Sequence, residues 1–258
     1  MANSLRTFQD SGVQETARPE TAQFSRLRRR RARHRIPCAT GNLTDDGNQQ
    51  YAWDLFNRLR EVKTSTGSLI VTYLYDAGNR RVRKDFPAGS SYTDTDYCYV
   101  GWQVLEETDT GSTTPNRQYV DGVYIDEHLV MDVNQDEHNS CIGANDSRRF
   151  CLHNTPYSAY GSTDNSGSLF EAYEYDPYGR HILLTRENDA NSLVDFAAND
   201  ARTTEGASTK SNPHAFAGQR SGEESSVSRY RSRYYDSQRG RFLSRDVIGF
   251  LDAPSQCP

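Results

Sequence analysis

The sequence predicts an all-β protein made of repeated antiparallel β-hairpins, and three observations lead to this fold class. Aromatic residues make up 11% of the 258 residues, and tyrosine dominates them with 16 copies against 10 phenylalanines and 2 tryptophans. Tyrosine suits strands because its ring packs on one side while its hydroxyl reaches water or a polar partner. Pairs of aromatic residues recur with a period of about 20 residues, and a turn signal follows each pair, which is typical of repeat architectures.

Residues 1–40 are predicted to lie outside the repeats. Seven of the ten residues 26–35 are arginine, and charges of one sign at this density repel one another and bury no apolar surface. We interpret the segment as a disordered leader or as a start that is foreign to the protein, with a tail for nucleic acid or an anionic surface as the alternative. Residues 1–10 contain no apolar stretch of the kind that a signal peptide needs.

Residues 41–185 are predicted to contain the repeat. One unit reads aromatic-x-aromatic-Asp, then a short turn, then Asn-Arg and an apolar residue. The two clearest units contain Trp53, Asp54, Asn57 and Arg58, followed 22 residues later by Tyr75, Asp76, Gly78, Asn79 and Arg80. Less regular units follow at Tyr97-Cys98-Tyr99, at Tyr119-Val120-Asp121-Gly122, and at Tyr173-Glu174-Tyr175-Asp176 with Gly179.

Each unit has the chemistry of a β-hairpin. Aromatic residues at positions i and i+2 lie on the same face of a strand. Aspartate bonds the backbone downstream of it, and glycine or asparagine two or three residues later tolerates the left-handed conformation of a tight turn. A single hairpin is only marginally stable, so stacked hairpins are expected to bury rows of tyrosines on one face of a sheet. A meander with chance Tyr-Asp pairs is the alternative, but chance does not explain the period.

The C-terminal part carries a second kind of motif. Residues 186–211, rich in Asn, Asp, Ala, Ser and Thr, predict a polar linker or insertion before it. The motif itself begins at Asn212-Pro213-His214 and continues to Gly249-Phe250. Together with the Tyr-Asp units, it resembles the Rhs (YD-repeat) family with its Rhs repeat-associated core domain, which includes toxin-complex C components and wall-associated proteins. The matching core positions are Gly218, Arg233, Tyr234, Tyr235, Asp236, Gly240, Arg241, Phe242 and Gly249.

The resemblance implies a structural role. YD repeats of this family wind into a spiralling β-sheet that closes as a hollow shell, and the core domain plugs one end. The expected domains are a leader (1–40), YD repeats (41–185), a linker (186–211) and a truncated core domain (212–258). The chain is therefore expected to be a C-terminal piece of a shell that encapsulates or presents a toxin-type region absent from this sequence.

The resemblance also points to one pair of candidate catalytic residues. In many family members an aspartyl-type self-cleavage cuts off the toxin, which stays inside the shell, and Arg245 and Asp246 match the first motif of that reaction. Val247 stands where the family has proline, and the only later acid, Asp252, does not match the partner position. Cleavage by an acid/base pair needs two carboxylates. The sequence therefore predicts that the chain is not an enzyme and does not cleave itself.

Three arginines of the core motif alternate along the chain. Arg229, Arg231 and Arg233 are predicted to share one face of a strand. Cross-strand pairing with acids and stacking on Tyr234 or Tyr235 is the favoured interpretation, and contact with an anion or a sugar acid is the alternative.

Composition excludes several other classes. The net charge is −5, and residues 38–258 hold 21 basic against 32 acidic residues, which gives no general case for nucleic acid. There is no apolar run of about 20 residues for a membrane span. Five cysteines without CxxC spacing predict no disulfide framework and no metal site, and no cofactor is expected.

Two alternatives to the shell remain open at this stage. One is an array that binds carbohydrate or a cell surface through exposed aromatics such as Tyr75 or Trp102, and the other is a self-cleaving core. Other YD repeats are the expected partners, added at a free strand edge. The family implies a secreted or cell-surface location, which the sequence itself leaves open.

Overall fold

The computed structural model describes residues 41–135, 140, 141, 143, 146–185, 201–204 and 212–246. The predicted leader, most of the predicted linker, Gly249 and Asp252 lie outside the described residues. All of the described residues belong to one compact unit, which comprises residues 34–258.

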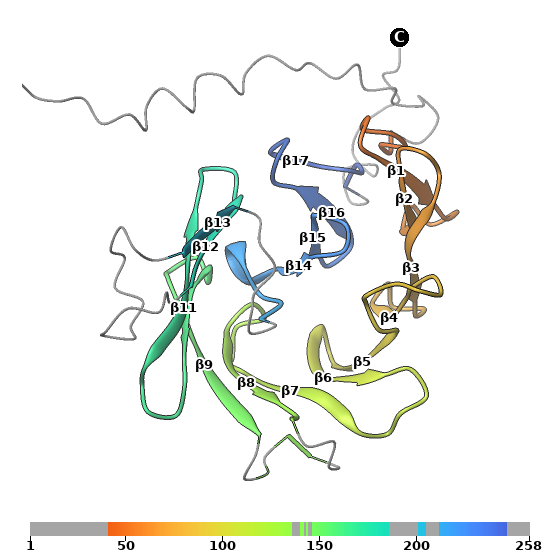
Figure 1. The fold of residues 1–258 in the computed structure, drawn as a ribbon. Helices are drawn as coiled ribbons and strands as arrows, with labels where there is room; N and C mark the ends of the chain where they lie inside the picture. The colour runs from red at the N-terminus through yellow and green to blue at the C-terminus, as the bar shows by residue number, and fades with distance from the viewer. Residues whose placement is uncertain are drawn as a thin grey trace, which may run out of the picture. The chain divides into compact units, whose positions relative to one another are not determined.

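Thirteen strands form one antiparallel sheet in which each strand pairs with the next one in the sequence (Figure 1). The strands are β1 (Gln49–Trp53), β2 (Leu59–Thr64), β3 (Leu69–Tyr75), β4 (Arg81–Asp85), β5 (Thr95–Val100), β6 (Gln103–Asp109), β7 (Pro115–Asp121), β8 (His128–Val133), β9 (Ser147–His153), β10 (Ala159–Thr163), β11 (Leu169–Tyr175), β12 (His181–Thr185) and β13 (Ala201–Thr204). The predicted all-β class of stacked hairpins is confirmed. No helix among the described residues has the length and apolar character needed to span a membrane.

The C-terminal residues build a second, smaller sheet. It contains β14 (Arg220–Gly222), β15 (Val227–Tyr230), β16 (Arg233–Asp236) and β17 (Arg241–Phe242), preceded by the 3₁₀ turn η2 (Phe216–Gly218). Figure 1 shows the large sheet curving around this small one, so that β14–β17 lie on its concave side. We call residues 212–246 the core segment.

The Tyr-Asp turns have one shared geometry. In the first, Asp54 and Arg58 close the hairpin with a main-chain N–H···O bond of 3.0 Å, and the N–H of Asn57 donates to the carbonyl of Asp54 at 3.1 Å. The carboxylate of Asp54 also accepts the N–H of Arg58 at 3.0 Å. Asn57 takes a left-handed φ of 59°, as asparagine tolerates. The turns at Asp76 and Asp176 repeat these bonds, with Asn79 and Gly179 in the left-handed position.

The strand pairing shifts register beside most of these turns. The shift falls next to the second aromatic residue of the unit, at Trp53, Tyr75 and Tyr99, and it marks a β-bulge. A bulge bends and twists its strand. The sheet therefore curves at the same position of successive units, which brings its inner face around the core segment.

The first aromatic residue of each unit points into the interior. These side chains are buried: Tyr51, Tyr73, Tyr97, Tyr119 and Tyr173. The prediction that stacking buries a row of tyrosines is confirmed. Tyr75, one of the side chains considered for stacking on carbohydrate, packs against the apolar core and is not free to do so.

The structure differs from the sequence interpretation at two turns. A further unit closes at Asn154, whose side chain accepts the N–H of Ser158 at 2.8 Å while Tyr157 takes the left-handed position with φ of 60°. The predicted single strand with Arg229, Arg231 and Arg233 on one face is wrong. Arg231 lies in the tight turn between β15 and β16 and has a φ of 52°. Residues i and i+2 share a face only within one continuous strand, and this turn divides the segment into two strands.

Candidate functional site: the interface between repeats and core

The second aromatic residue of each unit joins that unit to the one before it. The hydroxyl of Tyr75 donates to the carbonyl of Leu59 at 2.6 Å, and Tyr99 donates in the same way to Arg81 at 2.8 Å. Tyr175 and Trp53 repeat the bond with Ala159 at 2.6 Å and Leu43 at 2.7 Å. For Tyr75, Tyr99 and Tyr175, a carbonyl at the beginning of the preceding strand is thus satisfied by a side chain of the following strand.

The arginine of each turn contacts the unit that follows it in the sequence, whereas the second aromatic residue contacts the unit before it. Arg58 pairs with Asp54 at 2.6 Å, donates to the carbonyl of Asp76 at 3.1 Å and lies 5.0 Å from the ring centroid of Tyr75. Arg80 likewise pairs with Asp76 at 2.7 Å, donates to the carbonyl of Gly101 at 2.8 Å and lies 5.4 Å from the ring of Tyr99. The motif residues Arg58 and Arg80 therefore connect consecutive hairpins.

The inner tyrosines alternate with arginines in a stack. The guanidinium of Arg81 lies 5.0 Å from the ring of Tyr73 and 5.2 Å from that of Tyr97. Arg220, which belongs to the core segment, lies 5.3 Å from Tyr97 and 5.3 Å from Tyr119. Cation–π contacts of this kind strengthen when water is excluded. The core segment thus contributes one cation to a row that the repeats begin.

A buried ion pair fixes the core segment at a second point. Lys84 Nζ lies 2.8 Å from Glu224 Oε2, and the hydroxyl of Tyr73 donates to Glu224 Oε1 at 2.8 Å. Burial would raise the pKa of the Glu224 carboxyl, but the charges of Lys84 and Arg81 outweigh it and the pKa is lowered. Glu224 is therefore held as a carboxylate inside the protein.

The aromatic rings of the core pack on the same face. Tyr234 stacks on Tyr73 with ring centroids 5.4 Å apart, and its hydroxyl lies 3.0 Å from that of Tyr75. Leu243 N donates to Tyr234 O, and Leu43 N donates to Leu243 O, each at 2.8 Å. Backbone pairing thus continues from the core segment into the first repeat.

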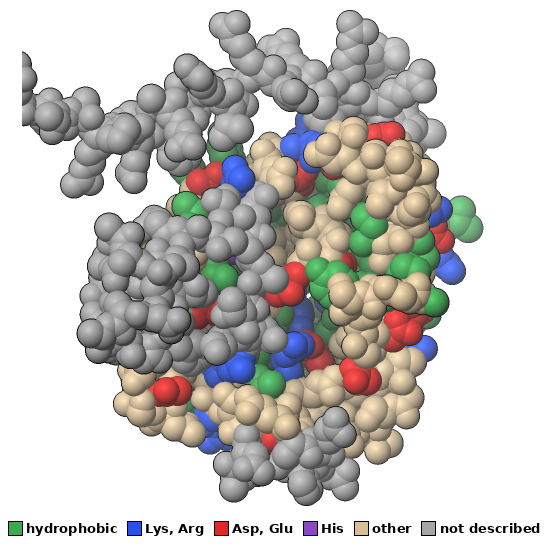
Figure 2. All heavy atoms as spheres, viewed as in Figure 1, with side chains coloured by type: hydrophobic (Ala, Val, Ile, Leu, Met, Phe, Trp, Pro, Cys, Tyr) green, Lys and Arg blue, Asp and Glu red, His purple; other side chains and the backbone are tan. Residues whose placement is uncertain are grey.

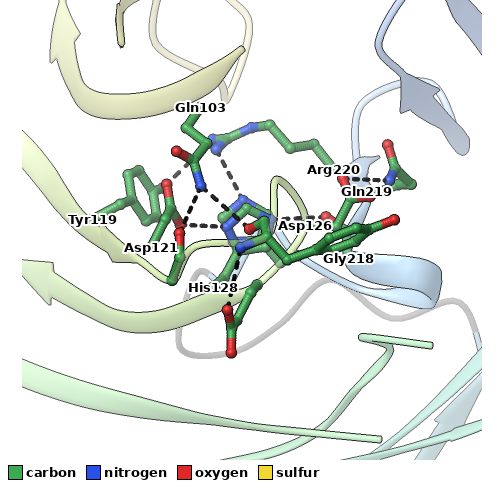
Figure 3. Close-up of polar contacts among 12 residues, drawn as sticks. Gln103, Tyr119, Asp121, Asp126, His128, Gly218, Gln219 and Arg220 are labelled. Atoms are coloured by element: carbon green, nitrogen blue, oxygen red, sulfur yellow. Dashed lines mark hydrogen bonds and ion pairs between the residues drawn. The ribbon is translucent and has the colours of Figure 1, made fainter. Parts of the chain in front are cut away.

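A third group of contacts surrounds His128 (Figure 3). Its ring nitrogens lie 2.6 Å from Asp121 Oδ1 and 2.9 Å from the carbonyl oxygen of Gly218. Gln219 donates to Asp126 at 2.9 Å. Gly218 adopts φ of 65° against the backbone of Asp126, where a side chain would collide. Position 218 therefore requires glycine, and Gly218 is one of the residues that match the core motif.

A polar cleft lies between the repeats and the core segment. Its volume is about 260 Å³, and charged groups from both sides line it, among them Arg81, Lys84, Glu107, Arg117 and Glu224. Figure 2 shows Lys or Arg and Asp or Glu side chains gathered in the hollow of this face. Within the described ranges, no cluster of three or more His, Cys, Asp or Glu side chains could hold a metal ion.

The core motif residues hold the small sheet together and attach it to the repeats. Tyr235 donates to the carbonyl of Tyr178 at 2.9 Å, and Gly240 lies directly against the Tyr178 ring. Asp236 pairs with Arg239 and is aligned with Arg241 across β16 and β17. Phe242 packs on Tyr235, with centroids 5.3 Å apart.

The candidate catalytic pair lies at the end of the described core segment. Asp246 Oδ2 is 3.1 Å from Arg233 Nη2, and half of the Asp246 side chain is exposed. Arg233 in turn lies 3.7 Å from the ring centroid of Phe242, while Arg245 lies against Gly41. Because Asp252 lies outside the described residues, the structure does not test the predicted absence of self-cleavage.

Sequence reasoning missed the charged interior. Several charged or titratable side chains of the strands are buried in the interior: Arg81, Glu107, His128, Arg149 and Glu171. One signal was available, since Glu171 sits two residues before Tyr173 and must therefore share its inward face. The partners of such residues come from distant parts of the chain and leave no local pattern.

Comparison with known proteins agrees with this architecture. No family model matches the chain. The tRNA3(Ser)-specific nuclease WapA of Bacillus spizizenii is 26% identical over 209 residues, and the tRNA nuclease WapA of Bacillus subtilis is 26% identical over 213 residues. Each alignment covers 80% of this chain and 7% of the relative, so the chain spans a small part of their length.

Solved structures show the same fold. The crystal structure of TcdB2-TccC3 matches with a TM-score of 0.57 and 19% identity, over 83% of this chain and 10% of that one. The Photorhabdus luminescens Tc holotoxin pore matches with a TM-score of 0.55 and 18% identity, over 82% of this chain and 9% of that one. The feature that these structures share with the chain is the fold, in which an antiparallel sheet of consecutive hairpins curves around a core segment. The chain is therefore similar in sequence to the WapA proteins and similar in fold to these TccC3-containing structures.

Proposed function

We propose that this chain is a wall segment that, with its core segment, holds a toxin-type C-terminal region inside or against a shell. The observation that carries the proposal is the attachment of the core segment to the concave face by the buried pair Lys84–Glu224 and the stack of Tyr234 on Tyr73. A segment fixed in this way closes the inner side of the sheet. The WapA relatives are named as tRNA nucleases, which supports a toxin as the enclosed part of a longer protein.

The same proposal includes assembly with further repeats. Among the described residues, β13 pairs with β12 alone, so its other edge offers unpaired backbone groups. Exposed strand edges pair with other strands unless they are covered. Additional YD hairpins added at this edge would extend the wall.

A proteolysis experiment tests the proposal. A trypsin-sensitive reporter peptide is appended after Pro258 in the full chain, and its cleavage is compared with that of the same peptide on an unrelated domain. We expect cleavage to be slowed about tenfold, because cleavage follows the population of the open state. Tyr73→Phe, which removes a bond to Glu224, should restore part of the cleavage. Equal cleavage on the two carriers would overturn the proposal.

A further inference from the structure

A pair of stacked imidazoles joins the core segment to the repeats. The ring centroids of His128, at the beginning of β8, and His214, in the core segment, are 3.4 Å apart, with 12° between the ring planes. Both side chains are buried. Two imidazoles stacked this closely away from water cannot both be positively charged without strong repulsion.

The hydrogen bonds of His128 assign the charge to that ring. Its Nδ1 faces Asp121 Oδ1 and its Nε2 faces the carbonyl oxygen of Gly218 (Figure 3). A carboxylate and a carbonyl only accept hydrogen bonds, so both ring nitrogens must donate, and only an imidazolium carries two N–H groups. Asp121 supplies the opposite charge.

The neighbours of His214 keep the second ring neutral. Arg220 Nη1 lies 3.3 Å from His214 Nε2, and because a guanidinium only donates, this nitrogen must carry a lone pair. Burial lowers the pKa of His214 well below its usual range, and the charges of His128, His153 and Arg117 lower it further. A proton added at Nε2 would point at the Arg220 guanidinium.

The surrounding acids are already paired. The charged or titratable groups around His214 in the described part of the chain include Glu107 of β6, Arg117, Tyr119 and Asp121 of β7, Asp126 of the β7–β8 turn, His128 of β8, His153 of β9, Arg220 of β14, Arg229 of β15 and Arg231 of the β15–β16 turn. Glu107 pairs with Arg117 at 2.6 Å and contacts Arg220, Asp121 pairs with His128, and Asp126 pairs with Arg231 at 2.7 Å. No acid of this group remains to offset a charge on His214.

We propose that His214 is a proton-controlled release for the core segment: acidification places a second positive charge in the stack and detaches residues 212–246 from the inner face of the repeats. The direction follows from linkage. The pKa of His214 in the attached state lies below the value of 6.5 for a free ring, so the contribution of neutral His214 to attachment is fully present above about pH 6.5. It weakens as the pH falls below that value, because the detached ring takes up the proton more readily. His153, whose pKa is also lowered by burial and by His128, acts in the same direction.

Hydrogen exchange of the full chain, measured by mass spectrometry between about pH 8 and about pH 5, tests the proposal. Exchange in β14–β16 is compared with exchange in β3–β4 of the same molecule, with exchange times scaled for the intrinsic rate at each pH. On acidification by about one unit below 6.5, we expect exchange of β14–β16 to rise about tenfold relative to β3–β4. His214→Phe should reduce the rise to the smaller part that His153 contributes, and the matched control His181→Phe in β12 should keep the full rise.

Two outcomes would overturn the proposal: a wild-type ratio that does not change with pH, or a rise in His214→Phe that is as large as in the wild type. If that variant does not fold, an NMR titration of the histidine rings in the wild-type chain decides. The His214 ring must then titrate below pH 6.5, together with shifts of core-segment resonances. Titration at or above that pH refutes the release.

Discussion

The ammonium group of Lys84 lies 2.8 Å from the carboxylate of Glu224, a residue 140 positions further along the chain. Only 13% of the Lys84 side chain and 2% of the Glu224 side chain are exposed. The pair connects β4 of the repeats with the turn between β14 and β15 of the core segment. Attachment of the core therefore depends on a charge pair that water does not screen.

Lys84→Met should destabilise the protein strongly. Removal of one partner leaves the buried Glu224 carboxylate uncompensated, which costs about 3–5 kcal/mol in comparable cases. The matched control is Lys63→Met, because Lys63 pairs with Glu61 at 2.8 Å where 36% and 30% of the two side chains are exposed. Such pairs contribute about 0–1 kcal/mol. Urea unfolding of the three proteins measures both effects, and equal losses would contradict a special role for Lys84.

The double variant Lys84→Met with Glu224→Gln tests whether the loss of stability comes from the unpaired Glu224 charge. The neutral amide no longer needs a cation, so the double variant should be more stable than Lys84→Met alone. A double variant that loses the full sum of the two single changes would show that the residues act independently.

The contrast between these pairs explains how far the sequence predicted the structure. The hairpins follow from local chemistry, since Asp76 and Asn79 build their turn from neighbouring residues. Attachment of the core depends on partners such as Lys84 and Glu224, which no spacing relates. The turn at Asn154 escaped notice because asparagine replaced aspartate there.

Tyr75→Phe should weaken the connection between consecutive hairpins. The change keeps the ring and removes the hydroxyl that donates to Leu59 O and contacts Tyr234. Loss of a buried hydrogen bond costs about 0.5–1.5 kcal/mol, and an unsatisfied carbonyl adds to this. Tyr92→Phe is the control, because 42% of Tyr92 is exposed. The two variants are compared by their unfolding midpoints in urea, and a midpoint for Tyr75→Phe equal to that of the control would refute the connection.

Position 79 should distinguish glycine from alanine. Asn79 has φ of 65°, and a left-handed conformation costs an alanine about 1–2 kcal/mol but costs glycine little. Asn79→Gly should therefore stay close to the wild-type thermal midpoint, while Asn79→Ala should fall below it. Calorimetry measures the thermal midpoints of the two variants. A midpoint of Asn79→Ala equal to or above that of Asn79→Gly would show that the turn does not depend on the left-handed conformation.

Asp46 should make stability sensitive to acid. Burial would raise the pKa of its carboxyl, but bonds from Gln49, Tyr51 and Asn48 outweigh burial and the pKa is lowered below 3.8. The group therefore stabilises the folded state above about pH 3.8, and this contribution is lost as the pH falls further. Unfolding free energies measured towards about pH 3 should decline less steeply in Asp46→Asn. An identical slope in the two proteins would exclude Asp46 as a source of acid sensitivity.

The purified full chain should keep its intact mass. Asp246 is paired with Arg233 and half exposed, and the only acid after it in the sequence, Asp252, does not match the partner position of the self-cleavage motif. Peptide cleavage by aspartates requires two carboxyls that share a proton, because one must act as acid while the other acts as base. Intact-mass spectrometry after prolonged incubation at acidic and neutral pH should therefore give one species for the wild type and for Asp246→Asn alike. A fragment that forms without added protease in the wild type and is absent from Asp246→Asn would establish Asp246 as catalytic and would overturn the view of this core segment as a purely structural element.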